Sequence, residues 1–201
     1  MNVMNKNYYQ KAAAAYEDGS DFIEQTELEG VLIINRPVFG DERGFFREVY
    51  RKADLETRTG LEIDFVQSNH SRSPKDTLRG IHIAPWHKLV TCANGLVQQV
   101  VVDTRPDSPT FGKHISIELG EGNFRNVFIP AGCGNAFLVL SESVDYTYLA
   151  SDYWAPGKEK DLLWNDGTLN IDWKSQTPLV SEKDNSNPTL AEVFPNKFNS
   201  Q

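Results

Sequence analysis

Titratable side chains that could transfer protons stand in or beside short apolar runs of this sequence. His82 lies in the run Leu78–Ile83, and Lys88 follows shortly after that run. Tyr146 and Tyr148 stand on either side of Thr147 in a second apolar run, so the two phenols share one face of a strand. Histidine, lysine and tyrosine are side-chain types used for general acid–base chemistry. A structural histidine and a core tyrosine with a satisfied hydroxyl are the ordinary alternatives.

Arg79 and His82 depend on the geometry of the strand that they share. They are three residues apart, so a regular strand would point them to opposite faces. Gly80 stands between them and could mark a β-bulge, which would change that relation.

Two further pairs of polar residues flank predicted strands and could bind a ligand. Arg43 and Glu48 enclose an aromatic pair, whereas Gln67 and Asn69 end an apolar run. In an all-β protein such residues lie at the mouth of the barrel, where ligands bind. An ordinary surface salt bridge is the alternative for Arg43 and Glu48.

The histidines and cysteines lack the spacing of a metal site or a disulfide framework. No His-x-His pair occurs at His82, and His87 is five residues away, which does not place both on one strand face. Cys92 and Cys133 form no Cys-x-x-Cys motif. The sequence therefore predicts no bound metal.

From residue 31 onward, short apolar runs alternate with turn residues, which is typical of an antiparallel sandwich or barrel. Asn94-Gly95 lies between two apolar runs and predicts a hairpin. Short helices are expected at 53–58 and near 189–193. The predicted strands are 31–35, 45–50, 63–69, Leu78–Ile83, 89–92, 96–104, 114–119, Asn126–Ile129, 135–140 and 144–151.

The composition indicates one folded domain. The chain has 201 residues, 39% hydrophobic and 11% aromatic, which suffices for a sizeable core. Its net charge of −8 without a basic cluster argues against nucleic-acid binding, and no apolar stretch is long enough to span a membrane. We expect an N-terminal arm, or a frayed terminus, at 1–22 and a single domain at 23–201. No signal peptide is visible, which predicts a cytoplasmic protein.

Several ordered sequence blocks resemble the dTDP-4-dehydrorhamnose 3,5-epimerase family. They are FGDERGFF at 39–46, FVQSNHS at 65–71, LRGIH at 78–82, VDTR at 102–105, SPTFG at 108–112, LWND at 163–166 and SEKD at 181–184. The resemblance covers about residues 27–195. It implies an all-β, cupin-type jelly roll (a double-stranded β-helix), usually a homodimer. Such an enzyme acts on the nucleotide-diphosphate derivative of a 4-keto-6-deoxyhexose without metal or organic cofactor.

The resemblance also assigns chemical roles to four residues. His82 would be the base that removes an acidic proton next to the ketone, and Asp184 would orient it. Tyr148 would be the acid on the opposite face, while Lys88 would stabilise the enolate oxygen. The implied reaction inverts C3, C5 or both.

The remaining matches are substrate contacts. Arg79 would lie near the base, Asn135 would contact the sugar, and Tyr153 or Trp154 would stack on the nucleobase. Some contacts would come from the neighbouring subunit. The nucleotide and diphosphate contacts are Arg43, Glu48, Gln67, Asn69, Glu159 and Lys183.

Three positions depart from the family pattern. Asn135 replaces a histidine that contacts the sugar, and an amide cannot carry a proton in catalysis. The segment 83–87 is shorter than usual and lacks a glutamine two residues after the base. Trp154 stands where a tyrosine is common. The first two departures lie at the sugar end, which suggests an altered sugar or carbon specificity.

Two other functions fit the same residues. A 3,4-ketoisomerase would use the same enolate on the same scaffold, although Tyr148 favours epimerisation. A cupin that binds nucleotide sugars without turnover would account for Asn135 and the short segment. The joint presence of His82, Asp184, Tyr148 and Lys88 argues against that last function.

Overall fold

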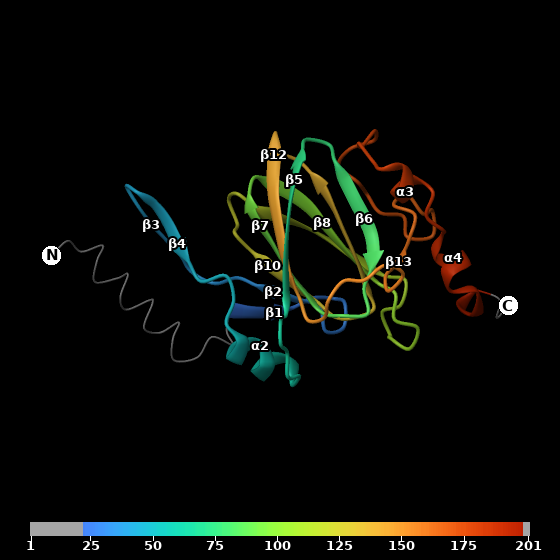
Figure 1. Ribbon diagram of the computed structural model, residues 1–201, viewed down its shortest axis with the longest axis horizontal. Coiled ribbons are helices and arrows are strands. Elements are labelled where there is room, and N and C mark those ends of the chain that lie inside the picture. The colour runs from blue at the N-terminus through green and yellow to red at the C-terminus, as the bar shows by residue number, and fades with distance from the viewer. Residues whose placement is uncertain (1–21, 199–201) are drawn as a thin grey trace.

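The computed structural model describes residues 22–198, which fold mainly into antiparallel β-strands with short peripheral helices (Figure 1). The prediction of an all-β fold is confirmed. The elements are β1 (Ile23–Gln25), β2 (Leu32–Ile34), β3 (Val38–Asp41), β4 (Gly44–Arg47), α2 (Lys52–Thr59), β5 (Gln67–Pro74), β6 (Leu78–Ile83), β7 (Lys88–Asn94), β8 (Leu96–Asp103), β9 (His114–Gly120), β10 (Asn126–Ile129), β11 (Cys133–Val139), β12 (Ser143–Ala150), β13 (Lys160–Asp161), α3 (Glu182–Asn185), α4 (Leu190–Val193) and η2 (Pro195–Lys197). The predicted N-terminal arm, 1–22, lies outside the described residues except for Phe22.

Within the described part of the chain, two large sheets face each other. The six-stranded sheet has the order β1-β2-β10-β7-β12-β5, and the five-stranded sheet has the order β13-β6-β11-β8-β9. Apolar side chains from both sheets fill the space between them, among them Val90 and Tyr146 from one and Val101 and Phe137 from the other. This interior is the main core.

The outer face of each sheet is also partly covered, which explains the nearly continuous burial of the central strands. Leu162 and Trp173, from the irregular C-terminal segment, pack on the outer face of the five-stranded sheet. On the six-stranded sheet, Leu55 of α2 packs with Leu32 and Phe128. β8 is consequently buried along its length apart from its first residue, and it shows no polar alternation.

The predicted hairpin at Asn94-Gly95 is wrong. The turn connects β7 to β8, but β7 pairs in the six-stranded sheet and β8 pairs in the five-stranded sheet. Gly95 has a φ of +79°, so the local turn chemistry is as expected. The strands diverge because Asn94 pairs with Asp145 and Leu96 pairs with Gly120.

The hairpin β3–β4 extends away from the two sheets, as Figure 1 shows. Arg47 anchors its base by donating to the Phe124 carbonyl oxygen, and Phe45 packs on the Phe124 ring at 4.6 Å between centroids. Phe46, which lies between these two anchoring residues, is 63% exposed. No helix of the described residues is long and apolar enough to cross a membrane.

An extra residue in β6 decides the direction of its polar side chains. Arg79 pairs with Phe137 and His82 pairs with Asn135, so three steps along β6 oppose two along β11. Phe137 faces the interior between the sheets, and residues paired directly across a ladder share a face. The bulge therefore turns both Arg79 and His82 toward the interior, which a regular strand could not do.

We predict that Gly80→Ala is much more destabilising than Gly44→Ala. The two glycines have φ of +125° and +124°, so the backbone strain of an alanine is matched. A Cβ at Gly80 would lie 2.5 Å from Ala136 Cβ, whereas one at Gly44 meets nothing within 4 Å. Urea denaturation should show a loss of about 1 kcal/mol at Gly44 and about 3 kcal/mol or more at Gly80. Equal losses would contradict the packing argument.

Candidate active site

His82 is held by a buried carboxylate. Asp184, in α3, is 4% exposed, and its Oδ1 lies 3.0 Å from His82 Nε2. Its Oδ2 accepts a hydrogen bond from the Gly80 N–H at 3.4 Å. Burial alone would raise the pKa of Asp184, but the contact with His82 and the Gly80 N–H lower it overall. The carboxylate thus occupies Nε2 and leaves Nδ1 for proton transfer.

A second carboxylate lies beside the imidazole. Asp161 pairs with His82 in the β13–β6 ladder, and its Oδ1 is 3.9 Å from His82 Nε2. Its other oxygen binds Lys183 Nζ at 2.9 Å, which raises the pKa of that ammonium. The structure therefore links Lys183 to the neighbourhood of His82 through Asp161. Sequence reasoning missed Asp161, because nothing in the sequence marks the two-residue strand that carries it.

Lys88 and Tyr148 lie together on the six-stranded sheet. Lys88 is 4% exposed, with its Nζ 3.0 Å from Glu159 Oε1 and 5.4 Å from the centre of the Tyr148 ring. Burial lowers the pKa of Lys88, although Glu159 and Asp161 oppose that shift. Burial raises the pKa of Tyr148, which keeps the phenol protonated at neutral pH.

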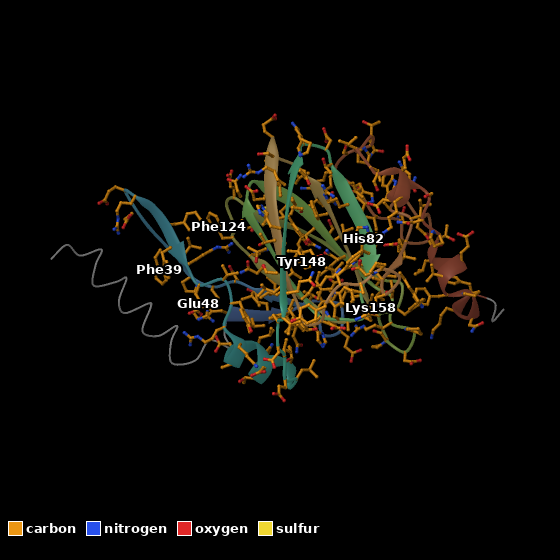
Figure 2. The ribbon with its side chains drawn as sticks, viewed as in Figure 1. Phe39, Glu48, His82, Phe124, Tyr148 and Lys158 are labelled. Atoms are coloured by element: carbon orange, nitrogen blue, oxygen red, sulfur yellow. The ribbon has the colours of Figure 1, made fainter. Side chains whose placement is uncertain are left out.

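His82 and Tyr148 come from opposite sheets. His82 is on β6 of the five-stranded sheet, and Tyr148 is on β12 of the six-stranded sheet (Figure 2). Tyr148 packs against the core between the sheets, and His82 faces the same interior through its pairing with Asn135. A planar carbon between them could lose a proton to one side and gain a proton from the other.

A chain of hydrogen bonds connects Lys88 to the exposed aromatic pair. Glu159 Oε2 accepts from Trp154 Nε1 at 3.1 Å, and the Trp154 backbone N–H donates to Gln67 Oε1 at 3.0 Å. Gln67 Nε2 donates in turn to Asn69 Oδ1 at 2.9 Å. The rings of Tyr153 and Trp154 are 63% and 53% exposed, so either could stack on a planar base.

Arg79 and Asn135 complete the side of the site that is formed by the five-stranded sheet. Arg79 Nε donates to Ser73 Oγ at 3.0 Å, which ties β6 to β5 of the other sheet. Asn135 lies directly across the ladder from His82. Ser73 was not predicted from the sequence.

Arg43 and Glu48 are not brought to His82 within this chain. Arg43 stands at the tip of the β3–β4 hairpin, where it pairs with Asp41 and its side chain is 83% exposed. Glu48 lies near the base of that hairpin, remote from His82 in Figure 2, and its Oε1 lies 2.6 Å from Arg36 Nη2 of the guanidinium group.

Three buried polar atoms around the site lack a hydrogen-bond partner among the described residues: Asn69 Nδ2, Trp86 Nε1 and Asp161 Oδ1. Asn69 pairs with Tyr148 in the ladder, Trp86 packs with Tyr148, and Asp161 borders His82. Burying such atoms unpaired is costly, so they are suited to a ligand with several polar groups.

The sequence contained a weak signal for Trp86, which stands in the shortened segment after the base. The described residues hold no group of three or more His, Cys, Asp and Glu side chains suited to a metal. The absence of a metal in the reaction stays a prediction.

We predict that Glu159→Gln lowers the free energy of unfolding by about 3 kcal/mol, because it leaves the buried Lys88 ammonium unpaired. The matched control is Asp152→Asn, which breaks the exposed 3.1 Å pair with Lys158 and should cost less than about 1 kcal/mol. Adding Lys88→Met to Glu159→Gln should recover most of the loss in urea denaturation. Equal effects of the two single substitutions would contradict a buried, coupled pair.

Comparisons with known proteins identify the family of this chain. The family model of dTDP-4-dehydrorhamnose 3,5-epimerase matches residues 25–192. The chain is 43% identical over 164 residues to the enzyme of that name from Shigella flexneri, covering 80% of this chain and 91% of that protein.

Two solved structures are similar over most of their length. One is dTDP-6-deoxy-D-glucose-3,5-epimerase RmlC from Legionella pneumophila Philadelphia 1, in complex with dTDP-4-keto-L-rhamnose. It has a TM-score of 0.81 and 37% identity over 85% of this chain and 93% of that one. The other is ChmJ, a 3'-monoepimerase from Streptomyces bikiniensis, in complex with dTDP-quinovose. Its TM-score is 0.80 and its identity 31%, over 86% of this chain and 90% of that one. The chain therefore belongs to the dTDP-4-dehydrorhamnose 3,5-epimerase family of cupin-fold isomerases.

Proposed function

We propose that this protein inverts C3, C5 or both in the dTDP derivative of a 4-keto-6-deoxyhexose, as a step of deoxysugar biosynthesis. The observation that carries the proposal is the placement of a carboxylate-bound histidine and a partly buried tyrosine on facing sheets. Similarity to 3,5-epimerases and to a 3'-monoepimerase supports the substrate class.

The reaction needs only proton transfers. The hydrogens on C3 and C5 are acidic because the adjacent C4 ketone delocalises the carbanion as an enolate. His82 Nδ1 takes the proton, and the resulting imidazolium is stabilised by Asp184. The Lys88 ammonium stabilises the negative charge on the C4 oxygen. Tyr148 donates its hydroxyl proton to the opposite face of the carbon, and solvent restores both groups.

The nucleotide end of the substrate would lie toward the exposed aromatic pair. Tyr153 or Trp154 stacks on the base, and Gln67, Asn69 and Glu159 form hydrogen bonds next to it. Arg79 and Lys183 lie near the reacting centre and supply positive charge for an anionic diphosphate.

A homodimer would complete this site. Phe45 and Phe46, on the projecting hairpin, are 54% and 63% exposed. An apolar hollow of about 570 Å³ adjoins them on the outer face of the six-stranded sheet, lined also by Leu89 and Leu149. Exposed apolar surface of this kind is typical of an interface. A second copy would bring Arg43 to the diphosphate of the first, and Glu48 to the same end of the substrate.

The remaining proposals concern the chain as a whole. The described residues from 23 onward form one catalytic domain. The protein works in the cytoplasm, which agrees with Cys92 and Cys133 being free thiols. No metal or organic cofactor takes part.

The test of the function is solvent exchange in D₂O. Wild-type protein with dTDP-4-keto-6-deoxyglucose should gain deuterium at C3, C5 or both, and His82→Asn should abolish the uptake. Tyr148→Phe should retain uptake, because His82 still exchanges the proton on its own face, but slow inversion roughly 100-fold or more.

NMR of the product separates the alternatives. A carbonyl moved to C3 would identify a ketoisomerase, and binding without uptake would identify a non-catalytic cupin. Loss of uptake in Tyr148→Phe would contradict the assignment of the two faces.

We predict that two poorly active variants complement each other in a mixed dimer, when one lacks His82 and the other lacks the Arg43 that its partner's site needs. His82→Asn and Arg43→Glu should each be poorly active, but a dissociated and reassociated mixture should recover about a quarter of the wild-type activity. The recovery comes from mixed dimers in which an intact His82 meets the partner's intact Arg43.

The control mixes His82→Asn with Tyr148→Phe. These two residues serve one site from one chain, so this mixture should recover nothing. Recovery there, or none with Arg43→Glu, would exclude the proposed exchange of hairpins.

A further inference from the structure

A buried network of three polar side chains lies under the sugar end of the site. Gln99, Asn135 and Tyr146 come from β8, β11 and β12, and thus from both sheets. Their exposed fractions are 0%, 7% and 2%. Gln99 Nε2 donates to Asn135 Oδ1 at 2.7 Å, and the Tyr146 hydroxyl donates to Gln99 Oε1 at 2.8 Å. The same hydroxyl lies 3.3 Å from Asn135 Oδ1.

The backbone determines which way these amides point. The Val100 carbonyl oxygen can only accept, so the Gln99 group facing it at 3.0 Å must be Nε2. The second proton on that nitrogen needs an acceptor, and Asn135 Oδ1 supplies it. Gln99 Oε1 then faces the phenol, which donates to it. Each orientation follows from the previous one, so Asn135 Nδ2 must point away from the network.

The free end of Asn135 is directed to the reacting centre. Asn135 pairs directly with His82, and residues so paired have Cβ atoms about 5 Å apart. Asn135 Nδ2 donates to no described residue. It is not one of the fully buried atoms without a partner, so part of its surface is exposed. It is therefore accessible from the space between the sheets, next to the imidazole.

We propose that Gln99 and Tyr146 are positioning residues that lock the Asn135 amide as a hydrogen-bond donor to one oxygen of the sugar. This inference rests on the proposed function and names the chemistry of its sugar subsite. The group bound there is an acceptor, a hydroxyl or keto oxygen, and Asn135 exchanges no proton with it. Burial raises the pKa of Tyr146, so the network stays neutral across the working pH range.

The test compares two neighbouring glutamines of β8. They are equally buried, but their side chains point to opposite faces of the sheet. Gln98 is 1% exposed, and its amide binds Ser116 Oγ and the Asp172 carbonyl oxygen on the outer side of the sheet. Gln99→Met and Gln98→Met each remove a buried amide with little change in shape.

Calorimetry of each variant with dTDP and with dTDP-glucose measures the affinity that the sugar adds. Gln99→Met should reduce this sugar increment about three- to tenfold, while the affinity for dTDP is unchanged and Gln98→Met resembles wild type. An equal sugar increment in the two variants would overturn the proposal.

Tyr146→Phe removes a single oxygen and serves if the methionine variants do not fold. It should reduce the sugar increment in the wild-type background but not in Asn135→Ala, because the hydroxyl acts only through that amide. An additive loss in the double variant would also overturn the proposal. Since these readouts need no turnover, failure of the epimerase function would show separately, as absent deuterium uptake by the wild type.

Discussion

The active site depends on one extra residue in β6. The bulge at Gly80 turns Arg79 and His82 to the same interior face, although three steps along the chain separate them. Only glycine fits there, because the φ is +125° and Ala136 occupies the place of a Cβ. The Gly80 N–H also binds the carboxylate of Asp184. The same backbone irregularity thus directs His82 to the interior and helps to hold the carboxylate that binds it.

Burial determines how the polar groups of the site behave. Lys88 and Glu159 are held together in the interior, where attraction is stronger than at the surface. Hydrogen bonds outweigh burial at Asp184 and lower its pKa, so it stays a carboxylate, whereas burial raises the pKa of Tyr148, a group that is already a phenol at neutral pH. These opposite outcomes provide an anion beside the base and a proton donor across from it, which is what epimerisation next to a ketone requires.

The net charge of −8 does not oppose an anionic substrate. Arg79, Lys88 and Lys183 lie in the site among Asp161, Glu159 and Asp184, so cations balance carboxylates there, whereas acidic residues are in excess over the chain as a whole. The hairpin β3–β4 carries a further cation, Arg43, away from the two sheets of its own chain. Under the proposed function, a single chain would hold the groups for proton transfer but only part of the surface for the diphosphate.

Much of the fold was predictable because local patterns determine strand positions. Leu78–Ile83 and Asn126–Ile129 have the predicted limits, since each is a short apolar run between turn residues. β5 begins at Gln67 rather than at 63, because Ile63 packs in the cluster with α2 and lies before the ladder.

The sequence by itself determined the all-β class, most of the strand runs of the two large sheets and, through ordered motifs, the residues proposed for proton transfer. Only the tertiary structure decided how β7 and β8 pair, because the turn at Gly95 is compatible with a hairpin or with a crossing between sheets. It also decided that Asp161 borders His82 and that Gln99 and Tyr146 orient Asn135. Those contacts join residues far apart in the chain, and their partners are selected by packing and hydrogen-bond satisfaction, which leave no local pattern in the sequence.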